Sequence, residues 1–414
     1  MRTTVPALTR RRFLTATAVT GAAALAVVGA TTVPWEDLFA SAGDLDPNAG
    51  VLVVVTLYGG NDGLNTVVPA SDPAYQKARP ELAYRAQDVL DVGEGIGLNP
   101  AMTGLKGLWD SGESLTIVRG VGYPEPDHSH FRSMAIWQTA SPTSPNGAGW
   151  LGRWLDAVSD GSAADPLRAL STETVLPPLL VGADRAGSTV APGTLDLPRG
   201  ALGRAVAGFA APDPTDDPWR AKAAASIGHL GTLRAAVDPA IEGGTVKPAV
   251  AKTGGKGGDL GHQLDLIAGL VEARVPTRVY SASLGGFDTH ADERGTQERL
   301  LGQLDAALTG FVQRLGGSDA GRQVTVLVYS EFGRRVQANA SEGTDHGTAS
   351  PVLLLGAGMR GGFTGQQPSL TDLYAGDLRA HVDFRDVYAS LVDKVLGADP
   401  DRVVPGHPGG TFAL

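Results

Sequence analysis

The stretch Thr325–Gly358 reads TVLVYSEFGRRVQANASEGTDHGTASPVLLLGAG and contains two short apolar runs separated by polar residues. The first run ends abruptly at Glu331, and the second covers Val352–Leu355. Continuous apolar runs bounded by turn residues are typical of buried parallel strands. Ligands in open α/β sheets bind at the carboxyl ends of such strands. The stretch therefore predicts a site formed by Glu331 and by Asp345-His346, on the loop that enters the second strand.

Composition sets the broad class. The chain has 414 residues, of which 42% are hydrophobic, enough for a large core. Its net charge of −10 disfavours a nucleic-acid surface, although a bound metal ion can still attract a small anionic substrate. There are no cysteines, so no disulfide is expected.

The first 42 residues have the pattern of a twin-arginine signal peptide. Thr9–Leu14 (TRRRFL) precedes the uncharged run Thr15–Ala30, and Ala40–Ala42 (ASA) fits a cleavage site. The run is short for a membrane span and rich in Ala, Gly and Thr, so no stable membrane anchor is expected. The pattern predicts export by the twin-arginine translocation machinery to the periplasm, cell envelope or exterior, leaving residues 43–414 as a single domain.

The clearest strand, Val51–Leu57, ends in Gly59-Gly60-Asn61-Asp62. The glycines permit a sharp turn, after which Asn61 and Asp62 present oxygen ligands at the strand end. The alternative is an ordinary polar turn with no ligand.

A second strand, Leu115–Val118, is followed by His128-Ser129-His130 and a predicted helix. A serine at a helix N-terminus can be activated as a nucleophile by the helix dipole, a neighbouring base or a metal. Alternatively, Ser129 or Asp127 only caps the helix.

A third strand, Thr277–Ser283, ends in glycines followed by Asp288 and His290. The amphipathic segment Glu298–Leu315 predicts a helix that crosses over to the strand beginning at Val324, which makes a βαβ unit.

Carboxylate and imidazole side chains therefore follow or precede four predicted strands. Such a mixture suits zinc, manganese or iron, and extra carboxylates also admit magnesium or calcium. The alternative is that each group is solvated or caps a turn. The candidate metal ligands are Asn61, Asp62, His128, His130, Asp288, His290, Glu331, Asp345 and His346.

Five motifs together resemble the uncharacterised bacterial DUF1501 family: GGNDGLN (59–65), SHF (129–131), GGFDTH (285–290), SEFGR (330–334) and GTDHG (343–347). That family is similar to the alkaline phosphatase/sulfatase-like superfamily. The resemblance implies a doubly wound, mostly parallel α/β sheet carrying one or two metal ions. It also implies Asp62 as a metal ligand, Ser129 as the nearest candidate nucleophile, and Asp288, His290 and His346 as ligands from later loops.

The sequence departs from the superfamily pattern in three places. No histidine stands beside Glu331, which leaves one metal site short of a ligand. The chain lacks both cysteine and a Ser-x-Pro-x-Arg motif, which disfavours the sulfatase formylglycine mechanism. Ser129 lies between two histidines, an unusual place for the nucleophile.

These observations predict an exported, metal-dependent hydrolase of phosphate, phosphonate or sulfate esters. Ser129 or a metal-bound hydroxide would attack, and Arg334 would neutralise developing charge. The alternative is a non-catalytic binding or cell-envelope protein on a degenerate hydrolase scaffold. An oxidoreductase is disfavoured because Gly59-Gly60 lacks the dinucleotide fingerprint.

Overall fold

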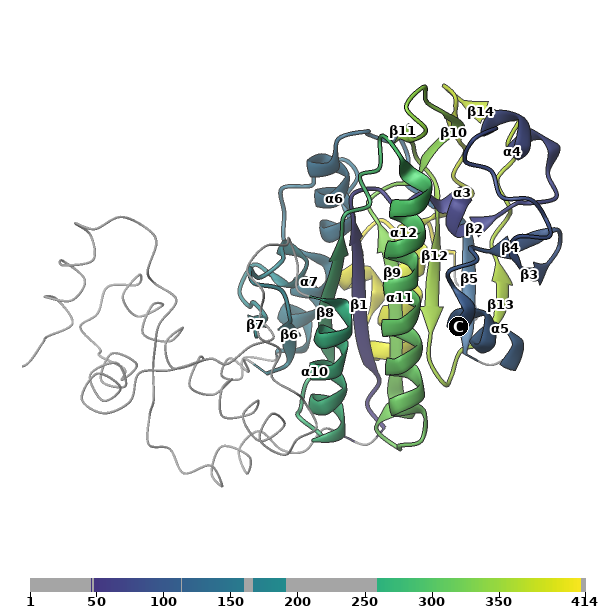
Figure 1. The fold of residues 1–414 in the computed structure, drawn as a ribbon. Helices are drawn as coiled ribbons and strands as arrows, with labels where there is room; N and C mark the ends of the chain where they lie inside the picture. The colour runs from purple at the N-terminus through teal and green to yellow at the C-terminus, as the bar shows by residue number, and fades with distance from the viewer. Residues whose placement is uncertain (1–45, 47, 113, 160–166, 191–258, 411–414) are drawn as a thin grey trace, which may run out of the picture.

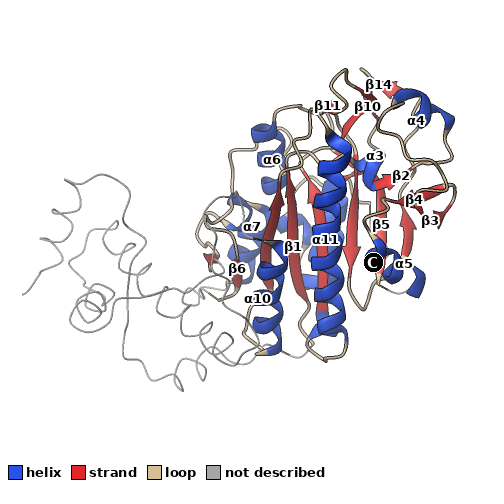
Figure 2. Cartoon of the chain, in the orientation of Figure 1, coloured by secondary structure: helices blue, strands red, loops and turns tan. Residues whose placement is uncertain are grey.

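A nine-stranded sheet with helices on both faces forms the centre of the molecule (Figures 1 and 2). The computed structural model describes residues 46, 48–112, 114–159, 167–190 and 259–410. The predicted α/β class with a mostly parallel, doubly wound sheet is confirmed. The predicted signal peptide, residues 1–42, lies outside the described residues.

The strands follow the order β13-β5-β12-β9-β1-β8-β6-β7, and β16 also pairs with β5. Within the described part of this sheet only β12 runs antiparallel to its neighbours. The strands are β1 (Val51–Tyr58), β5 (Leu115–Gly122), β6 (Ala169–Ser171), β7 (Ser188–Thr189), β8 (Val279–Gly285), β9 (Val324–Ser330), β12 (Ser350–Leu355), β13 (Gly362–Thr364) and β16 (Val382–Asp383).

β1 is a continuous apolar run because both of its faces are buried. Successive side chains of a strand point to opposite faces. Val53 and Val55 accordingly belong to one hydrophobic core, and Leu52 and Val54 belong to the core on the other side of the sheet.

Three helices cover one face: α5 (Thr103–Ser111), α10 (Leu260–Glu272) and α11 (Glu293–Gly316). α11 connects β8 to β9, two parallel strands that lie on either side of β1, as the predicted βαβ crossover requires. The opposite core contains α6 (His130–Thr139), α7 (Trp150–Val158), α12 (Phe384–Leu391), the π-helix η3 (Val392–Leu396) and α13 (Pro400–Val403).

The direction of β12 corrects one sequence expectation. The apolar run Val352–Leu355 predicts a parallel strand, but β12 is antiparallel to both β9 and β5. After β9 the chain forms a short hairpin, β10 (Arg334–Ala338) and β11 (Thr344–His346), and returns without a crossover helix. A return without a crossover reverses the strand. The loop that enters β12 therefore lies at the same edge as the carboxyl ends of the parallel strands.

Smaller elements complete the fold around the sheet. They are α3 (Gly63–Thr66), α4 (Pro73–Ala78), β2 (Val67–Val68), β3 (Leu90–Gly93), β4 (Ile96–Leu98), η1 (Pro178–Leu180), η2 (Gly321–Gln323), β14 (Leu373–Tyr374) and β15 (Asp377–Leu378).

None of the helices in the described ranges is long and apolar enough to cross a membrane.

Candidate metal centre

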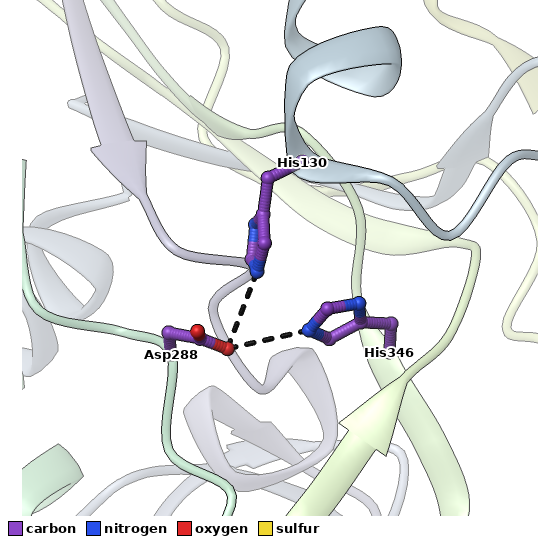
Figure 3. A group of neighbouring side chains, drawn as sticks. All are labelled: His130, Asp288 and His346. Atoms are coloured by element: carbon purple, nitrogen blue, oxygen red, sulfur yellow. Dashed lines mark hydrogen bonds and ion pairs between the residues drawn. The ribbon is translucent and has the colours of Figure 1, made fainter.

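Three side chains from separate segments of the chain meet at the carboxyl edge of the sheet (Figure 3). His130 is the first residue of α6, Asp288 follows β8, and His346 ends β11. Oδ1 of Asp288 lies 3.3 Å from Nε2 of His130 and 3.3 Å from Nε2 of His346. All three donor atoms lie within 4.8 Å of one another, close enough to share one metal ion.

A third imidazole adjoins this group. Nε2 of His290 lies 3.0 Å from Oδ1 of Asp288 and 2.9 Å from Nε2 of His346. Two imidazole nitrogens at this distance attract each other only with a proton or a cation between them. His130, Asp288, His290 and His346 are called the His/Asp cluster below.

The other ring nitrogen of each imidazole faces an oxygen outside the cluster. Nδ1 of His130 lies 2.9 Å from Oε1 of Glu331, and Nδ1 of His346 lies 2.6 Å from the carbonyl oxygen of His128. Nδ1 of His290 lies 3.5 Å from Oδ1 of Asp345. A carbonyl oxygen only accepts, so Nδ1 of His346 carries the hydrogen. In the neutral ring the lone pair on Nε2 then points at Asp288.

Glu331 is buried and held from three sides. Its Oε1 accepts from the backbone N–H of Gly59 at 3.0 Å, besides facing His130, and its Oε2 accepts from the Ser330 hydroxyl at 2.9 Å. The structure therefore places Glu331 behind His130, where it orients the ring and raises the pKa of His130. In His346, by contrast, burial lowers the pKa.

Arg334 is fully buried beneath the cluster. Its guanidinium donates to the carbonyl oxygens of Gly60, Thr344 and Phe287, and to Oδ1 of Asp288 at 2.8 Å. Burial acts to raise the pKa of Asp288, but the ion pair with Arg334 outweighs it and lowers that pKa to about 2. Because its donors are committed to protein oxygens, the geometry assigns Arg334 to holding Asp288 and the surrounding loops. This placement does not support the predicted contact with substrate charge.

The glycine pair after β1 permits close approach of these loops. Gly59 has φ +117°, and a Cβ there would lie 2.5 Å from the backbone nitrogen of Asp288. Gly60 has φ +69°, and a Cβ there would lie 2.2 Å from the ring of Phe332. Both positions require the absence of a side chain and a backbone conformation that favours glycine.

Asn61 and Asp62 lie apart from the His/Asp cluster, inside the core. Asp62 caps α3 by accepting from Leu64 N–H at 3.2 Å, and it forms a fully buried ion pair with Arg79. Asn61 bonds to the hydroxyl of Thr66 at 2.9 Å. A cap and an ion pair already satisfy the carboxylate, so the ligand role predicted for Asp62 has no support in this arrangement.

The side chains of His128 and Ser129 have their partners outside the cluster. Nε2 of His128 lies 2.9 Å from Oδ2 of buried Asp377. Ser129 is exposed and is the N-cap of α6, where its hydroxyl accepts from Arg132 N–H at 3.5 Å. Of this pair, only the backbone carbonyl of His128 contacts a cluster residue, through His346.

The donor set fits a divalent transition metal. Nε2 of His130 is buried, and its polar contact among the described residues is the 3.3 Å approach to Oδ1 of Asp288, so the atom faces the proposed ion position. Zinc prefers three or four histidine and carboxylate ligands, and manganese and iron accept the same set. Three imidazoles fit magnesium and calcium poorly, since these ions take oxygen ligands.

Comparison with known proteins supports part of the predicted resemblance. The family model DUF1501, a protein of unknown function, matches residues 249–414. This match confirms the resemblance over the segment that carries Asp288, His290, Glu331 and His346; His130 lies before it. A search of curated protein sequences found no significant match.

Two solved structures show distant similarity. One is the C-terminal periplasmic domain of EcEptC from Escherichia coli, in complex with Zn, with 9% identity, coverage of 89% of this chain and 90% of that chain, and a TM-score of 0.43. The other is the lipoteichoic acid synthase LtaP from Listeria monocytogenes, with 8% identity, coverage of 92% and 79%, and a TM-score of 0.35. At such low similarity the site has to be interpreted from its own geometry.

Proposed function

We propose that this protein is an exported enzyme that uses one divalent transition metal to cleave phosphate, phosphonate or sulfate esters. The convergence of three histidine Nε2 atoms on Asp288, each with its Nδ1 facing an oxygen, carries the proposal. Metal-binding histidines characteristically donate their second nitrogen to a carboxylate or a carbonyl.

The chain's own groups would divide the work as follows. His130, His346 and Asp288 would hold the ion, with His290 beside them, and Arg334 would fix Asp288 in its ionised form. A divalent ion bound there would supply Lewis acidity toward an anionic ester oxygen. Among the described cluster residues the donor set suffices for one ion, in keeping with the absence of a histidine beside Glu331.

Ser129 is disfavoured as the nucleophile. It is exposed, and none of the hydrogen bonds found for its hydroxyl in the described structure involves an imidazole or a carboxylate that would remove its proton. We therefore favour direct attack by water over a seryl intermediate.

Metal analysis followed by activity assays tests the proposal. Purified protein, reconstituted with zinc, manganese, magnesium or calcium, is expected to retain about one zinc or manganese ion per chain, by analogy with His/carboxylate zinc sites. The loaded protein is then assayed against phosphomonoesters, phosphodiesters, phosphonate esters and sulfate esters.

Paired histidine variants separate a specific site from general binding. His346→Ala should lose both metal and activity, whereas His262→Ala, an exposed histidine on α10, should retain both. Failure of the wild-type protein to bind any of the four metals would defeat the proposal. Metal binding without turnover of any ester would leave a non-catalytic binding or cell-envelope protein as the function.

A further inference from the structure

A cavity of about 380 Å³ lies beside the His/Asp cluster. It is bounded by the end of β5 and the loop after it (residues 122–126), the segment 378–383, Tyr374 of β14, and Phe332. Its volume falls within the range of about 300–1,000 Å³ that is usual for pockets that take small organic ligands. It is called the Phe332 cavity below.

Phe332 is shared by the cavity and the cluster. Its ring centroid lies 4.9 Å from the ring of His130 and 4.9 Å from the ring of His346, and the same residue lines the cavity. Phe332 therefore adjoins both the cluster and the cavity.

Two further segments also serve both places. The loop after β5 lines the cavity at Tyr123–Pro126 and continues to His128, whose carbonyl accepts from His346, and to His130. The segment that enters β12 contributes His346 to the cluster and then Thr348 and Ala349 to the cavity wall. A group bound in the cavity would therefore be held by the same loops that position the metal ligands.

The walls favour an uncharged, flat or apolar group. The lining residues include Tyr123, Trp137, Phe332, Tyr374, Leu378 and Val382, together with two prolines. Two acidic residues, an arginine and a histidine also line it. Arg379 pairs with Asp372 at 3.0 Å and Asp383 with Arg385 at 2.6 Å, while Glu125 and His381 lie at the wall as well. The aromatic part of such a wall binds aromatic rings and alkyl groups through buried apolar area.

We infer that the Phe332 cavity receives the aromatic or apolar group of the ester whose anionic group binds at the His/Asp cluster. The inference rests on the proposed function and adds the substrate class to it: esters of aromatic or bulky apolar alcohols, in preference to small alkyl esters.

Calorimetric titration with two phosphonates tests this on the zinc-loaded, full-length protein. Phenylphosphonate carries an apolar ring that methylphosphonate lacks, and neither contains an ester to be cleaved. The wild-type protein should bind the phenyl compound about 10-fold to 100-fold more tightly, because the ring buries extra apolar area.

Variants of exposed residues test whether the preference for phenylphosphonate over methylphosphonate arises in the Phe332 cavity. Tyr374 is 59% exposed and Ala380 is exposed, so neither substitution disturbs the core. Ala380→Trp should fill the cavity and abolish the preference while leaving methylphosphonate binding intact, and Tyr374→Ala should reduce the preference. Tyr374→Phe keeps the ring, and Val175→Ala changes an exposed residue outside the cavity lining; both should behave as wild type.

The outcomes separate this inference from the proposed function. Equal affinity for the two phosphonates, or a phenyl preference that survives Ala380→Trp, overturns the inference and leaves the metal enzyme standing. Binding of neither phosphonate to the zinc-loaded protein defeats the proposed function and, with it, the inference.

Discussion

Glu331 faces Nδ1 of His130 rather than the metal-binding side of the cluster. We expect Glu331→Gln to weaken zinc binding by about 10–100-fold, the usual cost of losing a carboxylate that supports a histidine ligand. Asp345→Asn should weaken it less, because Asp345 is 60% exposed and lies 3.5 Å from His290. Competition with a chromophoric chelator measures both affinities. Equal affinity of Glu331→Gln and wild type would show that Glu331 does not support the ligand.

Ser129 provides a test of mechanism at the level of one hydroxyl. Its side chain caps α6, so Ser129→Ala should lower the free energy of unfolding by about 1 kcal/mol. Ester hydrolysis should persist, because the hydroxyl is not placed as a nucleophile. Ser129→Asn is the matched control, since asparagine caps helices well but cannot form a seryl intermediate. Denaturant titration and kcat/KM report the two effects, and a collapse of kcat in both variants would restore Ser129 as the nucleophile.

At the scale of the element, α11 begins in a buried polar network beneath the loop after β1. Glu293 opens the helix, is 0% exposed, and accepts a hydrogen bond from the hydroxyl of Thr344. Burial, reinforced by the nearby negative charge of Asp62, raises the pKa of Glu293 to about 9. Asp62 keeps a lowered pKa because its ion pair with Arg79 outweighs its own burial. A protonated Glu293 can then donate to ionised Asp62.

This network predicts a pH-dependent stability. Between a pH of about 4.5 and about 9, the unfolded chain releases the Glu293 proton while the folded protein keeps it. The contribution of Glu293 to the free energy of unfolding is therefore full below this window and is lost as the pH rises through it. Its slope is at most about 1.4 kcal/mol per pH unit.

The variant Glu293→Gln should lack this slope, because glutamine mimics the protonated acid and does not titrate. Urea unfolding of both proteins from pH 5 to pH 9 checks the prediction. Relative to wild type, the variant should become steadily more stable as the pH rises. Parallel stability curves across the window would mean that Glu293 is ionised in the folded protein.

At the scale of the whole molecule, the sequence predicts that the protein is exported. Export has to occur before the protein can act in the cell envelope. Substitution of Arg10 and Arg11 by lysine should abolish export, since the paired arginines are the feature that the twin-arginine machinery reads. Cell fractionation measures the result, and Lys77→Arg, a charge-conserving exchange in α4, is the control. Normal appearance of the double variant outside the cytoplasm would refute the predicted route.

The architecture was largely predictable because buried strands leave a direct mark on sequence. β1 and β9 are mostly apolar because both faces of each strand are covered. The amphipathic segment from Glu298 predicted α11, although the helix begins five residues earlier, at Glu293. Strand direction leaves no such mark: the apolar residues of β12 suit either orientation, and its pairing with β5 and β9 decided it.

Two motifs show where local sequence stops determining the site. Gly59-Gly60-Asn61-Asp62 and Gly285-Gly286-Phe287-Asp288 both stand at the end of a strand, at the same sheet edge, and both end in aspartate. The sequence determined that each carboxylate would lie just beyond that edge. The orientation of each carboxylate depended on partners that are distant in the chain. Asp62 caps α3 and pairs with buried Arg79. Asp288 is held by Arg334 beside three imidazoles. A buried charge goes where an opposite charge and hydrogen-bond donors can compensate its lost hydration, and only the tertiary structure brings those groups together.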